Sequence, residues 1–60
     1  MKNKITVADA LKWAAMVATA EITNPIIEKL FGKNVNRLKL SNKDWKRIYQ
    51  EWDNQQSKQL

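Results

Sequence analysis

Basic side chains gather in one stretch of the chain, between residues 33 and 47. Lys and Arg side chains neutralise phosphate groups, and Arg, Gln and Asn also form hydrogen bonds to base edges in the major groove of DNA. The stretch holds six of the eleven basic residues of the 60-residue chain and one acid, so its formal charge is +5, the same as that of the whole chain. The basic residues of this stretch are Lys33, Arg37, Lys39, Lys43, Lys46 and Arg47, and their concentration favours a surface that binds a polyanion.

Residues 42–55 are expected to form a helix with two distinct faces. Trp45, Ile48, Tyr49 and Trp52 follow the i, i+3, i+4, i+7 spacing that is typical of a buried helix face. The opposite face carries basic and amide side chains, and the segment just before the helix adds two more cations. The nucleic-acid-binding residues predicted from this arrangement are Arg37, Lys39, Lys43, Lys46, Arg47, Gln50 and Asn54.

The same pattern has a simpler explanation. The outer face of a surface helix is normally charged, and a Lys-rich face keeps a small protein in solution. Aromatic residues at helical spacing are usually core residues, whereas stacking on bases requires an exposed ring. A helix-turn-helix is not matched, because its two helices are joined by a short turn, whereas the basic helix here follows a gap of about ten residues. A winged arrangement with residues 34–40 in a ribbon would tolerate that gap.

The chain lacks most of the residue types that enzymes commonly use for catalysis. The chain has no His and no Cys, so the commonest general base, the commonest metal ligand and a nucleophilic thiolate are all missing. Its single Gly cannot form a phosphate-binding loop, and the six carboxylates are scattered along the sequence. We therefore expect a binding protein rather than an enzyme, with no metal, no cofactor and no small-molecule substrate.

The elements that must position these residues are a few short helices. Thr6 with Asp9, and Ser41 with Asp44, have the spacing of capping boxes, and they predict helices over 7–20 and 42–55. Asn24 followed by Pro25 predicts the start of a short helix over 25–31. Residues 4–7 and 35–40 alternate in polarity, so they could pair as a small two-stranded ribbon or form an extended loop. The polar residues 54–60 are expected to be a frayed tail. The fold class expected is mainly α, a compact three-helix domain.

The first of these helices is apolar on more than one side. Residues such as Leu11 and Ala14 supply one core face, and a helix that is apolar nearly all round usually lies centrally. Either two helices clasp it, or its second side is an interface. The second case makes the chain a protein-interaction module, such as a phage- or plasmid-type inhibitor or adaptor, that forms a homodimer or docks on a host protein. The interface residues predicted are Trp13, Val17 and Ala20.

Size and hydropathy set the remaining expectations. A 60-residue chain is one domain, and such domains bury only about 60% of the surface that the unfolded chain exposes. Charges at positions 9 and 12 interrupt the apolar stretch near the N-terminus, so neither a secretory signal nor a membrane span is expected. The preferred interpretation is a small cytoplasmic DNA-binding or regulatory protein without a membrane partner.

Overall fold

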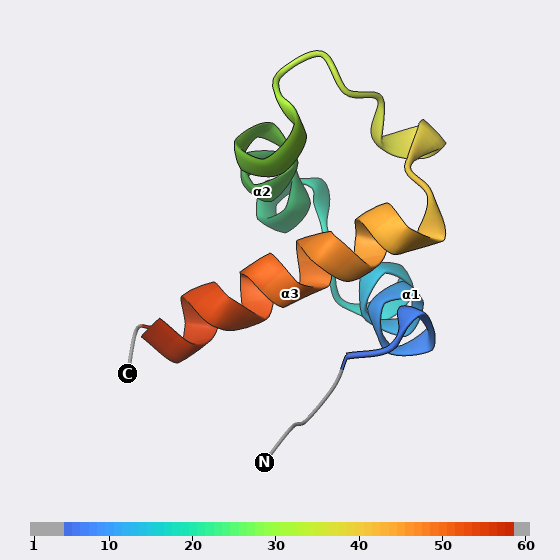
Figure 1. Cartoon of the computed structure of the whole chain (residues 1–60), viewed down its shortest axis with the longest axis vertical. Coiled ribbons are helices and arrows are strands. Elements are labelled where there is room, and N and C mark those ends of the chain that lie inside the picture. The colour runs from blue at the N-terminus through green and yellow to red at the C-terminus, as the bar shows by residue number, and fades with distance from the viewer. Residues whose placement is uncertain (1–4, 59–60) are drawn as a thin grey trace.

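Three α-helices and one short 3₁₀ turn form the structure, a computed structural model that describes residues 5–58. In chain order the elements are α1 (Val7–Met16), α2 (Ala20–Phe31), the 3₁₀ turn η1 (Arg37–Lys39) and α3 (Asn42–Lys58). The longest helix, α3, lies across α1 and α2 and contacts both of them (Figure 1). The chain is thus a mainly-α three-helix domain, as the sequence predicts.

Two of the helices begin with the reciprocal hydrogen bonds that the sequence predicts. At the start of α1, the amide of Asp9 donates to Thr6 Oγ1 over 3.1 Å, and the amide of Thr6 donates to Asp9 Oδ2 over 3.2 Å. At the start of α3, Ser41 and Asp44 form the same pair over 3.2 and 3.1 Å. These bonds satisfy amides that have no partner within the helix, so they stabilise both helix starts.

The end of α1 comes earlier than predicted, at Met16 rather than at residue 20. The carbonyl of Trp13 accepts two amides, from Val17 over 2.8 Å and from Ala18 over 3.0 Å. Val17 has left the helical conformation, with φ −121° and ψ −42°. The shared acceptor ends the regular ladder, and the chain turns into α2 within three residues.

The predicted start of α2 at Pro25 is wrong, because the helix begins at Ala20 and contains Pro25. Proline lacks an amide and disfavours a helical residue before it, so the local signal pointed to a boundary. Burial outweighs that signal here. Thr23 is fully buried, its hydroxyl donates to the carbonyl of Thr19 over 2.9 Å, and the next turn buries Ile26 and Ile27.

Gly32 ends α2, as the sequence predicts. Its φ is +105°, a conformation that side chains with a Cβ rarely adopt, and its amide donates to the carbonyl of Glu28 over 3.1 Å. The chain then leaves α2 in a new direction and returns to the start of α3 over residues 33–41.

The ribbon considered for residues 4–7 and 35–40 does not form. Residues 37–39 are the 3₁₀ turn η1, Ile5 is buried without strand structure, residue 4 lies outside the described part of the chain, and no strand occurs between residues 5 and 58. The Asn36 side chain explains the turn, because its Oδ1 accepts the amide of Leu38 over 2.9 Å. Alternating polarity at 37–40 therefore reflects a turn in which Leu40 packs on the core and Leu38 does not.

The last helix continues further than predicted, to Lys58 rather than to Gln55. Residues 54–58, expected to belong to a frayed tail, are thus helical, while residues 59 and 60 lie outside the described part. One turn within this helix is linked by the Gln55 amide, whose Nε2 donates to Glu51 Oε2 over 3.2 Å.

The core lies where α3 meets the two other helices. Its buried members are Trp13 of α1, Ile26 and Ile27 of α2, and Ile48 of α3. The aromatic residues predicted for the inner face of α3 pack against this cluster, which confirms that face. The central element is therefore α3 rather than the first helix, because α3 contacts both α1 and α2. Within residues 5–58, no helix is long and apolar enough to cross a lipid bilayer.

Candidate functional site

One side of α3 is exposed to solvent, apart from the contact of Arg47 with Phe31 of α2. Lys43, Arg47, Gln50 and Asn54 are all exposed, and their spacing of i, i+4, i+7 and i+11 places them in one line along the helix. We call these four residues the outer stripe. They lie on the side opposite the buried Ile48, and Lys46 is half-buried at their edge. The structure thus brings together four of the seven predicted nucleic-acid-binding residues on one exposed helix surface.

The cations of this region have no carboxylate partner in the part of the chain that the structure describes. Asp44, the only acid between residues 33 and 47, uses its carboxylate to accept the amide of Ser41. The ion pair that the structure does show in this area lies at the border with α2, where Lys29 Nζ and Glu51 Oε2 are 2.6 Å apart. Within the described residues, no ion pair joins Lys43 or Arg47 to a carboxylate, and the nearest acids along the chain are Asp44 and Glu51.

Arg47 of the outer stripe and Arg37 of η1 rest on aromatic rings. The guanidinium carbon of Arg47 lies 5.1 Å from the ring centroid of Phe31, and that of Arg37 lies 5.7 Å from the ring of Trp45. Arg37 Nη1 also donates to the side-chain oxygen of Asn24 over 3.4 Å. Such contacts leave the guanidinium group charged and restrict the positions that it can adopt.

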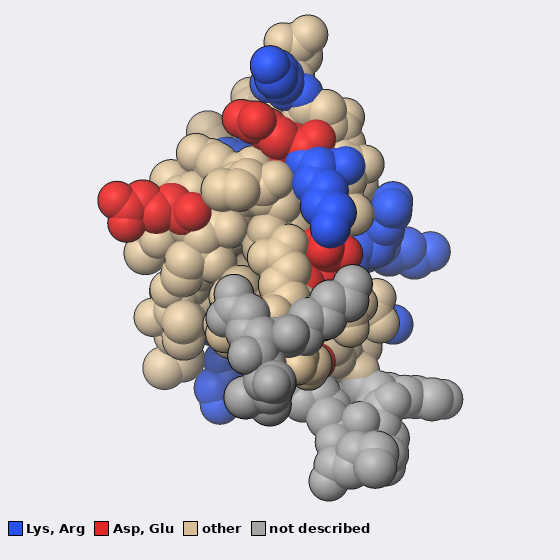
Figure 2. Space-filling model, turned by 90° about the vertical axis from the view of Figure 1, so that its left-hand side faces the viewer, with Lys and Arg blue, Asp and Glu red and all other residues tan. Residues whose placement is uncertain are grey.

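The three predicted residues outside the stripe lie beside its N-terminal end. Arg37 and Lys39 belong to η1, which leads into α3, and Lys46 lies within α3. Lys33, which the predicted set omitted, lines a polar hollow of about 330 Å³ together with Arg37 and Glu28. Figure 2 shows one face of the molecule on which carboxylates lie between basic side chains in the upper and right-hand parts. The outer stripe and η1 together contribute Arg37, Lys39, Lys43 and Arg47.

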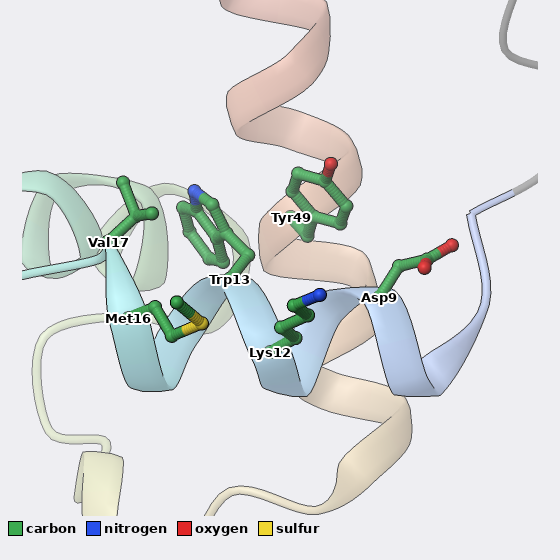
Figure 3. A pocket seen from close by; sticks show the side chains of 6 residues that line it. All are labelled: Asp9, Lys12, Trp13, Met16, Val17 and Tyr49. Atoms are coloured by element: carbon green, nitrogen blue, oxygen red, sulfur yellow. The ribbon is translucent and has the colours of Figure 1, made fainter.

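A second feature is a mostly apolar hollow between α1 and α3, with a volume of about 430 Å³. Figure 3 shows Met16 and Val17 on one side of it, the Tyr49 ring on the other and the Trp13 ring between them. Met16 is 73% exposed and Val17 is 54% exposed. The complete lining is Asp9, Lys12, Trp13, Met16, Val17 and Tyr49.

The predicted interface residues separate into two groups. Trp13 is 7% exposed and belongs to the core of the protomer, with its indole Nε1 buried and without an acceptor among the described residues. Val17 and Ala20 are exposed. Leu11, predicted for the core face of the first helix, is 37% exposed, so α1 is rotated relative to the expected orientation and presents Trp13 to α3.

No group of three or more potential metal ligands occurs among residues 5–58. No known protein family, curated protein or solved structure matches the chain. The function must therefore be argued from the two surfaces just described.

Proposed function

We propose that this protein binds duplex DNA, with α3 in the major groove. The observation that carries the proposal is the outer stripe, a line of two cations and two amides on an exposed helix, without a neighbouring carboxylate partner in the described structure. An α-helix with its side chains is about 10–12 Å wide and the major groove is about 12 Å wide, so the helix fits. The helices α1 and α2 pack against α3 and would hold it in place, with Phe31 of α2 bordering the outer stripe at Arg47.

The side chains of the stripe have complementary tasks in such a complex. Arg47, Gln50 and Asn54 can form hydrogen bonds to base edges, Arg preferring guanine and the amides preferring adenine. Lys43 and Lys46 can neutralise phosphates, and η1 adds Arg37 to the phosphate contacts. Double-stranded RNA fits less well, because its deep and narrow major groove excludes a helix.

The test measures how affinity depends on salt. Fluorescence anisotropy of a labelled mixed-sequence duplex gives the dissociation constant over a series of salt concentrations, for the parent chain and for Lys43→Ala. Each lost phosphate contact should lower the slope of log affinity against log salt by about 0.9. The double variant Lys43→Ala/Lys46→Ala should lower it by roughly twice that amount, because both lysines are assigned to phosphates.

Lys12→Ala is the matched control, because Lys12 is also an exposed lysine but lies on α1, away from the stripe. It should leave the slope of the parent unchanged. Absence of duplex binding at low salt, or equal effects of the Lys12 and Lys43 substitutions, would refute the proposal. Tighter binding to an RNA duplex of the same sequence would also contradict it.

A protein-binding role is the second candidate, and the hollow between α1 and α3 supports it. Met16 and Val17 expose apolar surface beside the rings of Trp13 and Tyr49. Apolar surface next to an apolar recess is typical of protein contact sites. The buried and unpaired Nε1 of Trp13 adds a hydrogen-bond donor that a partner's carbonyl could satisfy after a small rearrangement. A mass measured by light scattering separates a homodimer from a monomer that docks on another protein.

A further inference from the structure

Leu38 is the most exposed large apolar side chain among the described residues, at 88%. It is the middle residue of η1 and lies between Arg37 and Lys39. Two residues further on, Leu40 packs against the core, so the chain buries one leucine of this segment and exposes the other. Neither the core nor the outer stripe accounts for Leu38.

The turn that carries Leu38 is held at several points. The amide of Leu38 donates to Asn36 Oδ1 over 2.9 Å, and the amide of Lys39 donates to the carbonyl of Asn36 over 2.9 Å. Arg37 is fixed from the side by Asn24 and by the Trp45 ring. Because the turn is already ordered, less conformational entropy would be lost when Leu38 inserts into a ligand.

The charges beside Leu38 restrict what can cover it. Any surface that buries this side chain must also accept Arg37 and Lys39, which flank it in the chain. A DNA minor groove meets this requirement, because phosphates line both of its edges and its base steps can accept an apolar side chain. Leu is among the residues that proteins insert between base pairs there, unstacking one step and bending the duplex.

We propose that Leu38 enters the minor groove next to α3 and partly unstacks one base step, so that the bound duplex is bent. The inference rests on the proposed DNA-binding function and specifies the form of DNA that is bound. A segment that directly precedes a helix in the major groove is well placed for this, because only one phosphate strand separates the two grooves. Pyrimidine–purine steps unstack most easily, so a duplex with a central TA step should be preferred over one with an A-tract.

The experiment measures bending and affinity together. A duplex of about two helical turns with a central TA step carries a donor and an acceptor dye at its ends, and energy transfer is recorded as the parent chain or a variant is added. The parent should raise the transfer efficiency, because bending shortens the distance between the ends. Leu38→Ala should bind with the salt slope of the parent and lose this increase, while Leu38→Phe should retain it.

Leu11→Ala is the matched control, since it makes the same substitution at an exposed leucine of α1. It should bend DNA as the parent does. If the parent binds DNA without bending it, or if Leu38→Ala bends it fully, the insertion is refuted and DNA binding stands. If the parent does not bind the duplex at low salt, both proposals fail. Leu38-dependent binding to vesicles of anionic phospholipid, with no bending of DNA, would assign Leu38 to a membrane surface and would also overturn the inference.

Discussion

The helices α1 and α2 pack against α3 through contacts of different chemistry. On the α1 side the contact is a group of rings. The ring centroid of Trp13 lies 5.1 Å from that of Tyr49 and 5.4 Å from that of Trp52, and the two rings of α3 are themselves 6.0 Å apart. Aromatic pairs at these distances add about 0.5–1.5 kcal/mol to the free energy gained by burying their area.

On the α2 side the contact is aliphatic at its centre and charged at its border. Ile26 and Ile27 pack in the same buried cluster as Ile48. The border carries the ion pair of Lys29 with Glu51. The Arg47 guanidinium, stacked on a ring of α2, is a second charged contact at this border.

The helices α1 and α2 thus pack on the same helix, α3, through contacts that should differ in their dependence on salt. Ring packing is insensitive to salt, whereas exposed ion pairs are weakened by it. Aromatic burial makes the α1 contact the stronger one, while part of the α2 contact depends on charges near the proposed DNA surface. The following predictions test this comparison.

The largest effect is expected for Trp13→Ala, which removes the only α1 ring from the aromatic group. Truncation of a buried Trp costs about 3–5 kcal/mol, and a small domain has only a few kcal/mol of stability. Calorimetry should therefore show no cooperative unfolding transition for this variant. A folded Trp13→Ala chain with a transition near that of the parent would show that the ring group does not hold α1.

Ile27→Ala should have a smaller effect, on the α2 side. Loss of a buried Ile costs about 2–5 kcal/mol, with the lower values where neighbours can close the gap, as flexible aliphatic neighbours can. We expect a folded or partly folded chain whose amide protection is lost first in α2, measured by hydrogen exchange. Uniform loss of protection in α1 and α2 would mean that the two contacts form one cooperative unit.

Substitutions at the two capped helix starts should change the free energy of unfolding by an intermediate amount. Ser41→Ala and Thr6→Ala each remove a side-chain cap and should cost about 1 kcal/mol, because an amide loses its acceptor. Thr19→Ala is the control, since Thr19 precedes α2 without a side-chain cap bond. Its unfolding temperature should stay near that of the parent, while each capped start should lose about 4–8 °C per kcal/mol.

These starts also show what the sequence could predict. The two capping boxes and the inner face of α3 depend on residues three or four positions apart, so local spacing was sufficient to find them. The start of α2 depends on the burial of Thr23, Ile26 and Ile27, and the two isoleucines pack in one cluster with Ile48 far along the chain, which no local signal contains. The rotation of α1 has the same cause, because only the rings of α3 decide whether Trp13 or Leu11 turns inward.

The candidate site was partly predictable for the same reason. The outer stripe follows from helix periodicity once the inner face of α3 is known. The contacts of Arg37 with Asn24 and Trp45 join three separate segments, so they could not be derived from spacing. Alternating polarity over residues 35–40 would place Leu38 and Leu40 on the same side of a strand, whereas the 3₁₀ turn capped by Asn36 separates the two.

A smaller effect is expected from the ion pair at the border of α2. Lys29→Met keeps the aliphatic stem and removes the charge, so it should cost about 0.2–1 kcal/mol at low salt. The difference from the parent should vanish in about 1 M salt, where screening is nearly complete. Lys33→Met is the control, and it should leave stability unchanged at both salt concentrations. A Lys29 effect that persists at high salt would show that packing, rather than charge, holds this border.

The smallest effect on stability is expected for Val17→Glu. Val17 is 54% exposed and lies outside both helix contacts, so the variant should stay within about 0.5 kcal/mol of the parent. Ala10→Glu on the same helix is the control. Ala10 is fully buried, and a carboxylate placed there should unfold the chain. If the parent is a dimer and Val17→Glu is a folded monomer, the hollow between α1 and α3 is an interface.

The ring group of α1 and α3 also has an optical consequence. Indoles as close as those of Trp13 and Trp52 share their excited states, so their transitions should appear in circular dichroism as a pair of bands of opposite sign. These bands would disappear when α1 separates from α3, even if both helices remained intact. Trp45, which faces Arg37 instead, would report by fluorescence on whatever approaches η1. The Trp13–Trp52 pair would thus report on the packing of α1 against α3, and Trp45 alone would report on the proposed binding surface.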